Sequence, residues 1–213
     1  MSNGNLHKTI FFKNEKKDFY INKPKPALFL DRDGVILKEC NHLSNPNKVF
    51  LEKGIKKLTE FISSKNIPLI IITNQSGIHR GEYSWEEYEI VTERMLELLG
   101  SKVKIHAIYA NSEDRNCTIF KWRKPSPEMI FLAEKEFNLD LSKSFLIGDR
   151  KSDLEAGINA KITNLVHVNT GHGKNEREMI KRDLKSTNKN PYNLKLIENL
   201  EEIVLCNLLK NFY

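Results

Sequence analysis

The stretch Ala27–Ile36 constrains the fold of this chain more than any other part of its sequence. It runs Ala-Leu-Phe-Leu-Asp-Arg-Asp-Gly-Val-Ile, so a short apolar run ends in two carboxylates separated by one residue and followed by glycine. Such a run predicts a strand buried on both faces of a parallel sheet, and Gly34 allows the backbone to turn sharply after it. Ligands bind beyond the carboxyl ends of parallel strands, so we expect Asp31 and Asp33 at the mouth of a site.

Further apolar runs alternate with stretches of helical spacing along the rest of the chain. Ile55, Leu58 and Ile62, for example, recur at the three- and four-residue intervals of an amphipathic helix. Strands that alternate with helices predict an α/β fold, here a doubly wound parallel sheet of the Rossmann-like type. We expect further strands at 68–73, 103–109, 144–149 and 164–169, and further helices that begin near Ser84, Ser126 and Ser152.

Three serines mark the expected starts of those helices. Ser84 with Glu87, and Ser152 with Glu155, have the three-residue spacing of a capping box, in which the two residues satisfy each other's free backbone N–H groups. Ser126 is expected to be an N-cap, with the proline after it in the first helical position.

The chain is long enough for one sizeable α/β domain and short for two. We expect residues 27–213 to form that domain. Residues 1–26 are predicted to be an N-terminal extension that packs a strand or hairpin on it, because the prolines of Lys23–Pro26 mark a boundary. The C-terminal forty residues predict one or two helices, the last carrying Leu196, Leu200, Ile203 and Leu208.

Composition sets the expected surroundings of the protein. The formal net charge of +6 is mild and could favour anionic partners, but alone it decides nothing. The three cysteines are far apart and form no C-x-x-C pair, which predicts free thiols in a reducing compartment. The first residues contain no apolar leader segment, and no apolar run approaches the length that spans a membrane. We therefore expect a cytoplasmic protein without membrane contact. We also expect it to be a monomer.

Polar signatures follow the ends of several expected strands. Because each comes from a different loop between a strand and a helix, all can meet at one edge of a parallel sheet. A further pair, Arg123 and Lys124, stands just before an expected helix. The strand-end signatures are Asp31-x-Asp33, Thr73-Asn74-Gln75 and Gly148-Asp149.

Together these groups supply what phosphoryl transfer needs. Asp31 can attack phosphorus and carry the phosphoryl group as an aspartyl-phosphate. Asp33 can protonate the leaving oxygen and later activate water. Asp149, with Asp31 and the backbone carbonyl of Asp33, can hold Mg²⁺.

The remaining candidates are expected to bind the substrate. The Thr73 hydroxyl and the backbone N–H groups near Asn74 and Gln75 can bind phosphate oxygens. Lys124 supplies a point charge, and Arg123 can hold a phosphate or hydroxyl group of the substrate bidentately.

Over roughly residues 27–173, the chain resembles the haloacid dehalogenase superfamily of aspartate-nucleophile phosphatases. Within it, the chain resembles the D-glycero-D-manno-heptose 1,7-bisphosphate phosphatases and their histidinol-phosphatase relatives. This resemblance implies a compact enzyme without a large cap domain, which removes phosphate from a small sugar or related metabolite. The resemblance rests on Asp31-Arg-Asp-Gly-Val, Ile72-Thr-Asn-Gln-Ser-Gly-Ile-His-Arg-Gly81, Arg123-Lys-Pro-Ser-Pro-Glu-Met129, Gly148-Asp-Arg-Lys-Ser-Asp153 and Asn169-Thr-Gly-His-Gly173.

One departure from that family concerns metal. The family typically binds zinc in a loop of Cys and His just before Arg-Lys-Pro, whereas the matching positions here are Asn111, Glu113, Phe120 and Trp122. Cys117 alone cannot build a tetrahedral zinc site. We therefore expect no structural zinc, and we expect packing of Phe120 and Trp122 to hold the loop.

The other departure concerns the substrate. The family's substrate loop usually carries an Asn and a Gly-Tyr pair, but here the loop is Leu37–His42, Leu-Lys-Glu-Cys-Asn-His. A heptose bisphosphate is the expected substrate, with a histidinol-phosphate-type metabolite as an alternative. A polynucleotide 3′-phosphatase and an inactive homologue that binds a phosphorylated ligand are further alternatives. Nucleic acid is not expected, because no stretch interleaves basic and aromatic residues along the chain.

Overall fold

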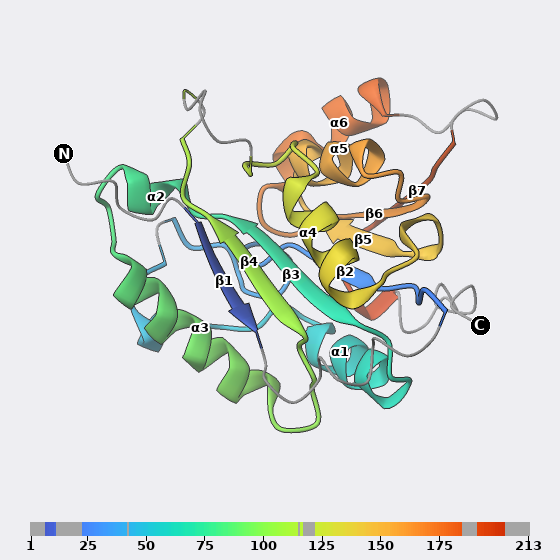
Figure 1. Cartoon of the computed structure of the whole chain (residues 1–213). Coiled ribbons are helices and arrows are strands. Elements are labelled where there is room, and N and C mark those ends of the chain that lie inside the picture. The colour runs from blue at the N-terminus through green and yellow to red at the C-terminus, as the bar shows by residue number, and fades with distance from the viewer. Residues whose placement is uncertain are drawn as a thin grey trace.

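A computed structural model describes residues 7–11, 23–41, 43–114, 116, 122–184 and 191–202. Its centre is a seven-stranded sheet with the strand order β1-β4-β3-β2-β5-β6-β7 (Figure 1). Strands β2 to β7 pair in parallel, and β1 joins the edge of the sheet antiparallel to β4. The strands are β1 His7–Phe11, β2 Leu28–Leu30, β3 Leu69–Asn74, β4 Ala107–Asn111, β5 Phe145–Gly148, β6 Asn164–Val168 and β7 Asn193–Ile197.

Helices cover both faces of this sheet. In Figure 1, α1 and α3 lie on one face, and α4, α5 and α6 lie on the other. The expected doubly wound α/β fold is therefore confirmed. The helices are α1 Ile55–Ser64, α2 Ser76–His79, α3 Trp85–Leu99, α4 Glu128–Phe137, α5 Lys151–Asn159 and α6 Gly173–Asp183, with short 3-10 turns at Pro46–Lys48 and Leu141–Lys143.

The central strand β2 is buried on both faces, as its apolar run predicts. Leu28 and Leu30 pack with residues of α1 and α3, whereas Phe29 packs with residues of α4, α5 and α6. All three side chains are completely shielded from solvent. Full burial of such side chains contributes about 1.5–3 kcal/mol each, which holds the end of β2 in a fixed place.

Two of the three predicted helix starts differ from the structure. The capping box of Ser84 and Glu87 at the start of α3 is confirmed, with hydrogen bonds in both directions. The N-cap of α4 is Pro127 rather than Ser126. The predicted box of Ser152 and Glu155 is wrong, because α5 begins at Lys151 and its N-cap is Arg150. The carboxylate that accepts a hydrogen bond from the Arg150 N–H is that of Asp153.

The C-terminal segment is also different from its prediction. A helix, α6, is present, but Leu196 lies in β7, which pairs in parallel with β6. The side chains of β7 alternate between exposed and partly buried until Ile197, which is the period of a strand. Ile203 and Leu208 lie outside the described residues. The strand predicted at 103–109 begins later than expected, because β4 is Ala107–Asn111.

No helix in the described part of the chain combines the length and the apolar character that crossing a membrane requires.

Candidate active site

The carboxyl ends of β2, β3 and β5 meet in one pocket, as the sequence predicts. Its volume is about 230 Å³. Most of the residues that the sequence singles out line it. These are Asp31, Asp33, Thr73, Asn74, Gln75 and Lys124.

Lys124 is the central cation of this pocket. Only 3% of it is exposed, yet its Nζ lies 2.6 Å from Asp31 Oδ1 and 2.7 Å from Asp153 Oδ1. The Nζ also donates a hydrogen bond to the Ile72 carbonyl at 3.0 Å. Burial by itself lowers the pKa of Lys124, but the carboxylates of Asp153 and Asp31 raise it above its ordinary value. The ammonium group is therefore charged at neutral pH.

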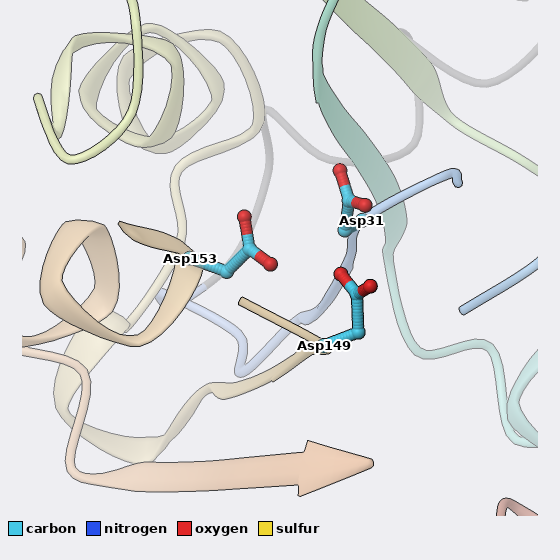
Figure 2. A group of neighbouring side chains, drawn as sticks. All are labelled: Asp31, Asp149 and Asp153. Carbon is cyan, nitrogen blue, oxygen red and sulfur yellow. The ribbon is translucent and has the colours of Figure 1, made fainter. Parts of the chain in front are cut away.

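Three buried aspartates form a cluster, and two of them, Asp31 and Asp153, contact this ammonium group. One carboxylate oxygen from each of Asp31, Asp149 and Asp153 lies within 4.8 Å of the others, and Figure 2 shows the three side chains grouped together. Burial, together with the neighbouring carboxylates, raises the pKa of Asp31 to about 7 and that of Asp149 well above its ordinary value. One ammonium group cannot offset three carboxylates.

This cluster has the donor set of a divalent cation site. Three carboxylates and one ammonium group leave a formal excess of two negative charges, which one Mg²⁺ ion would neutralise. Among the described residues, no group donates a hydrogen bond to Asp149 Oδ1. A buried and unpaired carboxylate oxygen is costly unless a cation or proton faces it, so the residues present fit a hard divalent cation.

Two glycines make room for the Asp149 carboxylate. Gly34 and Gly171 both have positive φ, at +84° and +52°, and a Cβ on either would lie 2.4 Å from Asp149 Oδ2. The same oxygen accepts a hydrogen bond from the backbone N–H of His172 at 2.7 Å. Only glycine fits at these two positions, which explains their place in the motifs after β2 and β6.

Asp33 belongs to a separate network beside the cluster. The guanidinium group of Arg32, only 1% exposed, donates to the Asp33 carboxylate at 3.0–3.3 Å and to Gln75 Oε1 at 2.9 Å. Gln75 Nε2 in turn donates to Asp33 Oδ2 at 2.7 Å and to Thr73 Oγ1 at 2.8 Å. Tyr83 donates its hydroxyl hydrogen to Gln75 Oε1 at 2.7 Å. The side chain of Asp33 is thus held by a cation and an amide.

Asn74 fixes the backbone of the neighbouring segment rather than only lining the pocket. Its Oδ1 accepts a hydrogen bond from the backbone N–H of Lys124 at 3.1 Å, and its Nδ2 donates to the Lys124 carbonyl at 3.2 Å. Arg123 is not among the described residues that line the pocket. Its Nη1 donates to the backbone carbonyl of Glu113 at 3.0 Å. A role of Arg123 in substrate binding therefore stays a prediction.

Asn111 and Glu113, two of the four positions that match the family's expected zinc ligands, form hydrogen bonds. Asn111 and Glu113 are buried, and Asn111 Oδ1 accepts a hydrogen bond from the Glu113 N–H at 3.3 Å. Glu113 Oε2 accepts from the backbone N–H groups of Trp122 and Arg123, each at 3.0 Å. The ring centroids of Trp122 and Tyr109 lie 6.4 Å apart. The expected packing involving Phe120 lies outside the described residues, and the absence of structural zinc stays a prediction.

Sequence reasoning missed three residues of the site. Asp153 was not singled out as a candidate, although a carboxylate four residues after Asp149 near the start of a helix is a visible signal. Arg32 also had a signal, because a charged residue between two carboxylates in an apolar stretch needs a partner. No sequence signal indicated Tyr83, because its contact with Gln75 depends on the path of the chain between α2 and α3.

Comparisons with known proteins agree with this geometry. A family model described as HAD-hyrolase-like matches residues 121–199. The D-glycero-beta-D-manno-heptose-1,7-bisphosphate 7-phosphatase of Helicobacter pylori (strain ATCC 700392 / 26695) is 39% identical over 142 residues, which cover 65% of this chain and 80% of that protein. The D-glycero-alpha-D-manno-heptose-1,7-bisphosphate 7-phosphatase of Photorhabdus laumondii is 39% identical over 171 residues, which cover 73% of this chain and 88% of that protein.

A solved structure shares the fold. The D,D-heptose 1,7-bisphosphate phosphatase of B. bronchiseptica, complexed with magnesium and phosphate, aligns with a TM-score of 0.75 and 21% identity over 87% of this chain and 99% of its own. The fold, the site and these relatives together define a phosphatase of the haloacid dehalogenase superfamily. Within that superfamily, the chain belongs to the family of the D-glycero-D-manno-heptose-1,7-bisphosphate 7-phosphatases.

Proposed function

We propose that this chain is a Mg²⁺-dependent phosphomonoesterase that removes the 7-phosphate of D-glycero-D-manno-heptose 1,7-bisphosphate or a related sugar phosphate. The observation that carries the proposal is the placement of Asp31. Its carboxylate lies at the end of a buried strand, within 2.6 Å of a buried ammonium group, in a pocket that also holds Asp33. A nucleophile, an acid–base group and a phosphate-binding cation are thereby brought together.

In the first proposed step, Asp31 attacks the phosphorus atom. A bond forms between a carboxylate oxygen and phosphorus, while the bond from phosphorus to the sugar oxygen breaks. Asp33 gives its proton to that leaving oxygen, so the sugar departs as an alcohol. Asp31 must be ionised to attack. Burial opposes this by raising its pKa to about 7, and the charge of Lys124 favours it.

In the second step, water replaces the aspartate on phosphorus. Asp33, now a carboxylate, takes a proton from the water as the water oxygen attacks phosphorus. The bond between phosphorus and the Asp31 oxygen breaks, which releases inorganic phosphate and restores the carboxylate. The hydrogen bonds from Arg32 and Gln75 keep the Asp33 side chain oriented through both steps.

Mg²⁺ would be held by Asp31, Asp149 and the backbone carbonyl of Asp33, with Asp153 beside them. When bound, the cation supplies positive charge that offsets the crowded carboxylates and the phosphoryl oxygens. The related phosphatase of B. bronchiseptica, solved with magnesium and phosphate, supports this assignment.

Thr73 and Lys124 are the proposed contacts of the reacting phosphate. Thr73 Oγ1 accepts a hydrogen bond from Gln75, and a hydroxyl group that accepts still has its own hydrogen to donate to a phosphate oxygen. Arg80 and Arg150 also line the pocket. These two cations and Arg123, the neighbour of Lys124 in the chain, are the proposed contacts of a second anionic group of the substrate.

A substrate panel tests the proposal. The purified protein is given Mg²⁺ and either anomer of the heptose bisphosphate, heptose 7-phosphate, histidinol phosphate or a 3′-phosphorylated oligonucleotide, and phosphate release is measured. We expect a heptose bisphosphate to have the highest kcat/KM and Arg123→Ala to reduce its advantage over the monophosphate. Fastest turnover of the oligonucleotide, with binding that weakens steeply as salt rises, would favour the nucleic-acid alternative instead.

A further inference from the structure

Glu113 is a buried carboxylate that none of the proposed chemical steps uses. It follows β4, and only 1% of it is exposed. Its Oε2 accepts hydrogen bonds from two consecutive backbone N–H groups, those of Trp122 and Arg123, each at 3.0 Å. Arg123 Nη1 also donates a hydrogen bond to the backbone carbonyl of Glu113 at 3.0 Å. Three hydrogen bonds thus join Glu113 to residues 122 and 123.

Glu113 is itself anchored to the sheet. The Asn111 side chain accepts a hydrogen bond from the Glu113 N–H, and the Asn111 carbonyl accepts one from the Gln75 N–H at 2.6 Å. Asn111 also pairs with Asn74 at the ends of β4 and β3. The carboxylate therefore has a fixed position relative to these two strand ends.

The next residue after the two held amides is Lys124. Asn74 holds its backbone N–H and carbonyl, while its Nζ reaches Asp31 at 2.6 Å. The three successive residues 122–124 are thus tied to the ends of β3 and β4 by two side chains. If the Glu113 side chain is truncated, the backbone N–H groups of residues 122 and 123 lose these two hydrogen bonds.

We propose that Glu113 is a positioning residue, which holds the main chain of residues 122 and 123 and so sets where the Lys124 ammonium group meets the reacting phosphate. The inference rests on the proposed phosphatase mechanism, in which Lys124 acts on the transferred phosphoryl group. A displacement of about 1 Å of such a group can reduce the rate about 10²-fold. Because Lys124 acts mainly on the transition state, the loss falls on kcat rather than on KM.

The test uses the full chain with Mg²⁺ and heptose bisphosphate, and compares Glu113→Ala, Glu113→Gln, Lys124→Met and the double variant Glu113→Ala/Lys124→Met. Asp31→Asn, which lacks the proposed nucleophile, is the inactive reference. Glu97→Gln, at an exposed position of α3, is the matched control. For each variant, kcat, KM, thermal midpoint and hydrogen exchange of the 122–124 amides are measured. Glu113→Gln keeps the shape and one acceptor oxygen, so it remains informative if the alanine variant folds poorly.

We expect Glu113→Ala to lower kcat about 10²-fold with a much smaller change in KM, and to speed exchange of the Trp122 and Arg123 amides. Glu113→Gln is expected to be intermediate, and Glu97→Gln unchanged. Because both residues act through one group, the double variant is expected to be no slower than Lys124→Met alone.

Two results would overturn the positioning role. One is a wild-type kcat in Glu113→Ala and Glu113→Gln while Asp31→Asn is inactive. The other is a double variant whose loss is the product of the two single losses, which would mean that Glu113 acts independently of Lys124. Failure of the proposed function is distinguishable from both, because the wild type would then release no phosphate from the sugar, or Asp31→Asn would release it as fast as the wild type.

Discussion

The two sides of the active site differ in how their polar groups are satisfied. On the acidic side, formed by Asp31, Asp149 and Asp153 after β2 and β5, burial and mutual repulsion raise the pKa values of Asp31 and Asp149. On the amide side, formed by Thr73 and Asn74 at the end of β3 and by Gln75 just after it, both amide side chains donate and accept hydrogen bonds. Gln75 alone donates to two acceptors and accepts from two donors.

The two sides therefore have different roles in the active site. The acidic side holds charge close together, at a cost in folding free energy that the ammonium group of Lys124 offsets in part and that the proposed Mg²⁺ ion would offset further. The amide side carries no net charge, and its paired groups fix distances between backbone segments. Lys124 connects the two, because Asn74 holds its backbone while Asp31 and Asp153 receive its ammonium group.

The largest effect is expected from Asp31→Asn on the acidic side. The change removes the nucleophile but keeps the shape of the side chain, so turnover should fall on the order of 10⁴-fold or more while the fold is retained. Phosphate release and circular dichroism measure the two quantities. Turnover near the wild-type rate would contradict the assigned mechanism.

Lys124→Met removes the connection between the two sides. Loss of one donor to the developing charge should lower kcat about 10²- to 10³-fold. It also leaves Asp31 and Asp153 without their buried partner, which should reduce the free energy of unfolding by about 3–5 kcal/mol. Urea unfolding and steady-state kinetics check both. An unchanged stability would mean that the acidic side does not depend on the ammonium group.

Magnesium should stabilise the folded protein through the acidic side alone. At a concentration about 100 times its Kd, a ligand that binds only the folded state adds about 2.7 kcal/mol. We expect Mg²⁺ to raise the thermal midpoint of the wild type and of Glu97→Gln, but to have little effect on Asp149→Ala. An equal rise in Asp149→Ala would place the cation elsewhere.

The smallest of these effects is expected when a charge is added to the amide side. Asn74→Asp replaces the donor that faces the Lys124 carbonyl with a carboxylate oxygen, and should cost about 1–3 kcal/mol in the free energy of unfolding. Asn159→Asp is the matched control, because the exposed amide of Asn159 also donates to a backbone carbonyl, that of Pro125 at 3.0 Å. Equal effects in urea unfolding would show that the amide side is no more sensitive to charge than the surface.

Much of the site could be predicted because parallel strands share an edge. Asp31, Thr73 and Asp149 each follow a buried apolar run, so their meeting follows from the fold class alone. The contacts of Arg32 and Glu113 could not be predicted in the same way. Their hydrogen bonds join residues of different loops, and no local spacing in the sequence specifies which loops approach each other.

The sequence by itself determined the fold class, the alternation of buried strands with helices over residues 28–168, and the carboxylates at the strand ends. These depend on hydrophobic period and on turn residues, which are local properties of the chain. Only the tertiary structure decided that 193–197 is a strand, that Asp153 shares the ammonium group of Lys124, and that Glu113 holds residues 122 and 123. The physical reason is that pairing with β6, burial and hydrogen bonding between distant segments contribute free energy only once the sheet has brought those segments together.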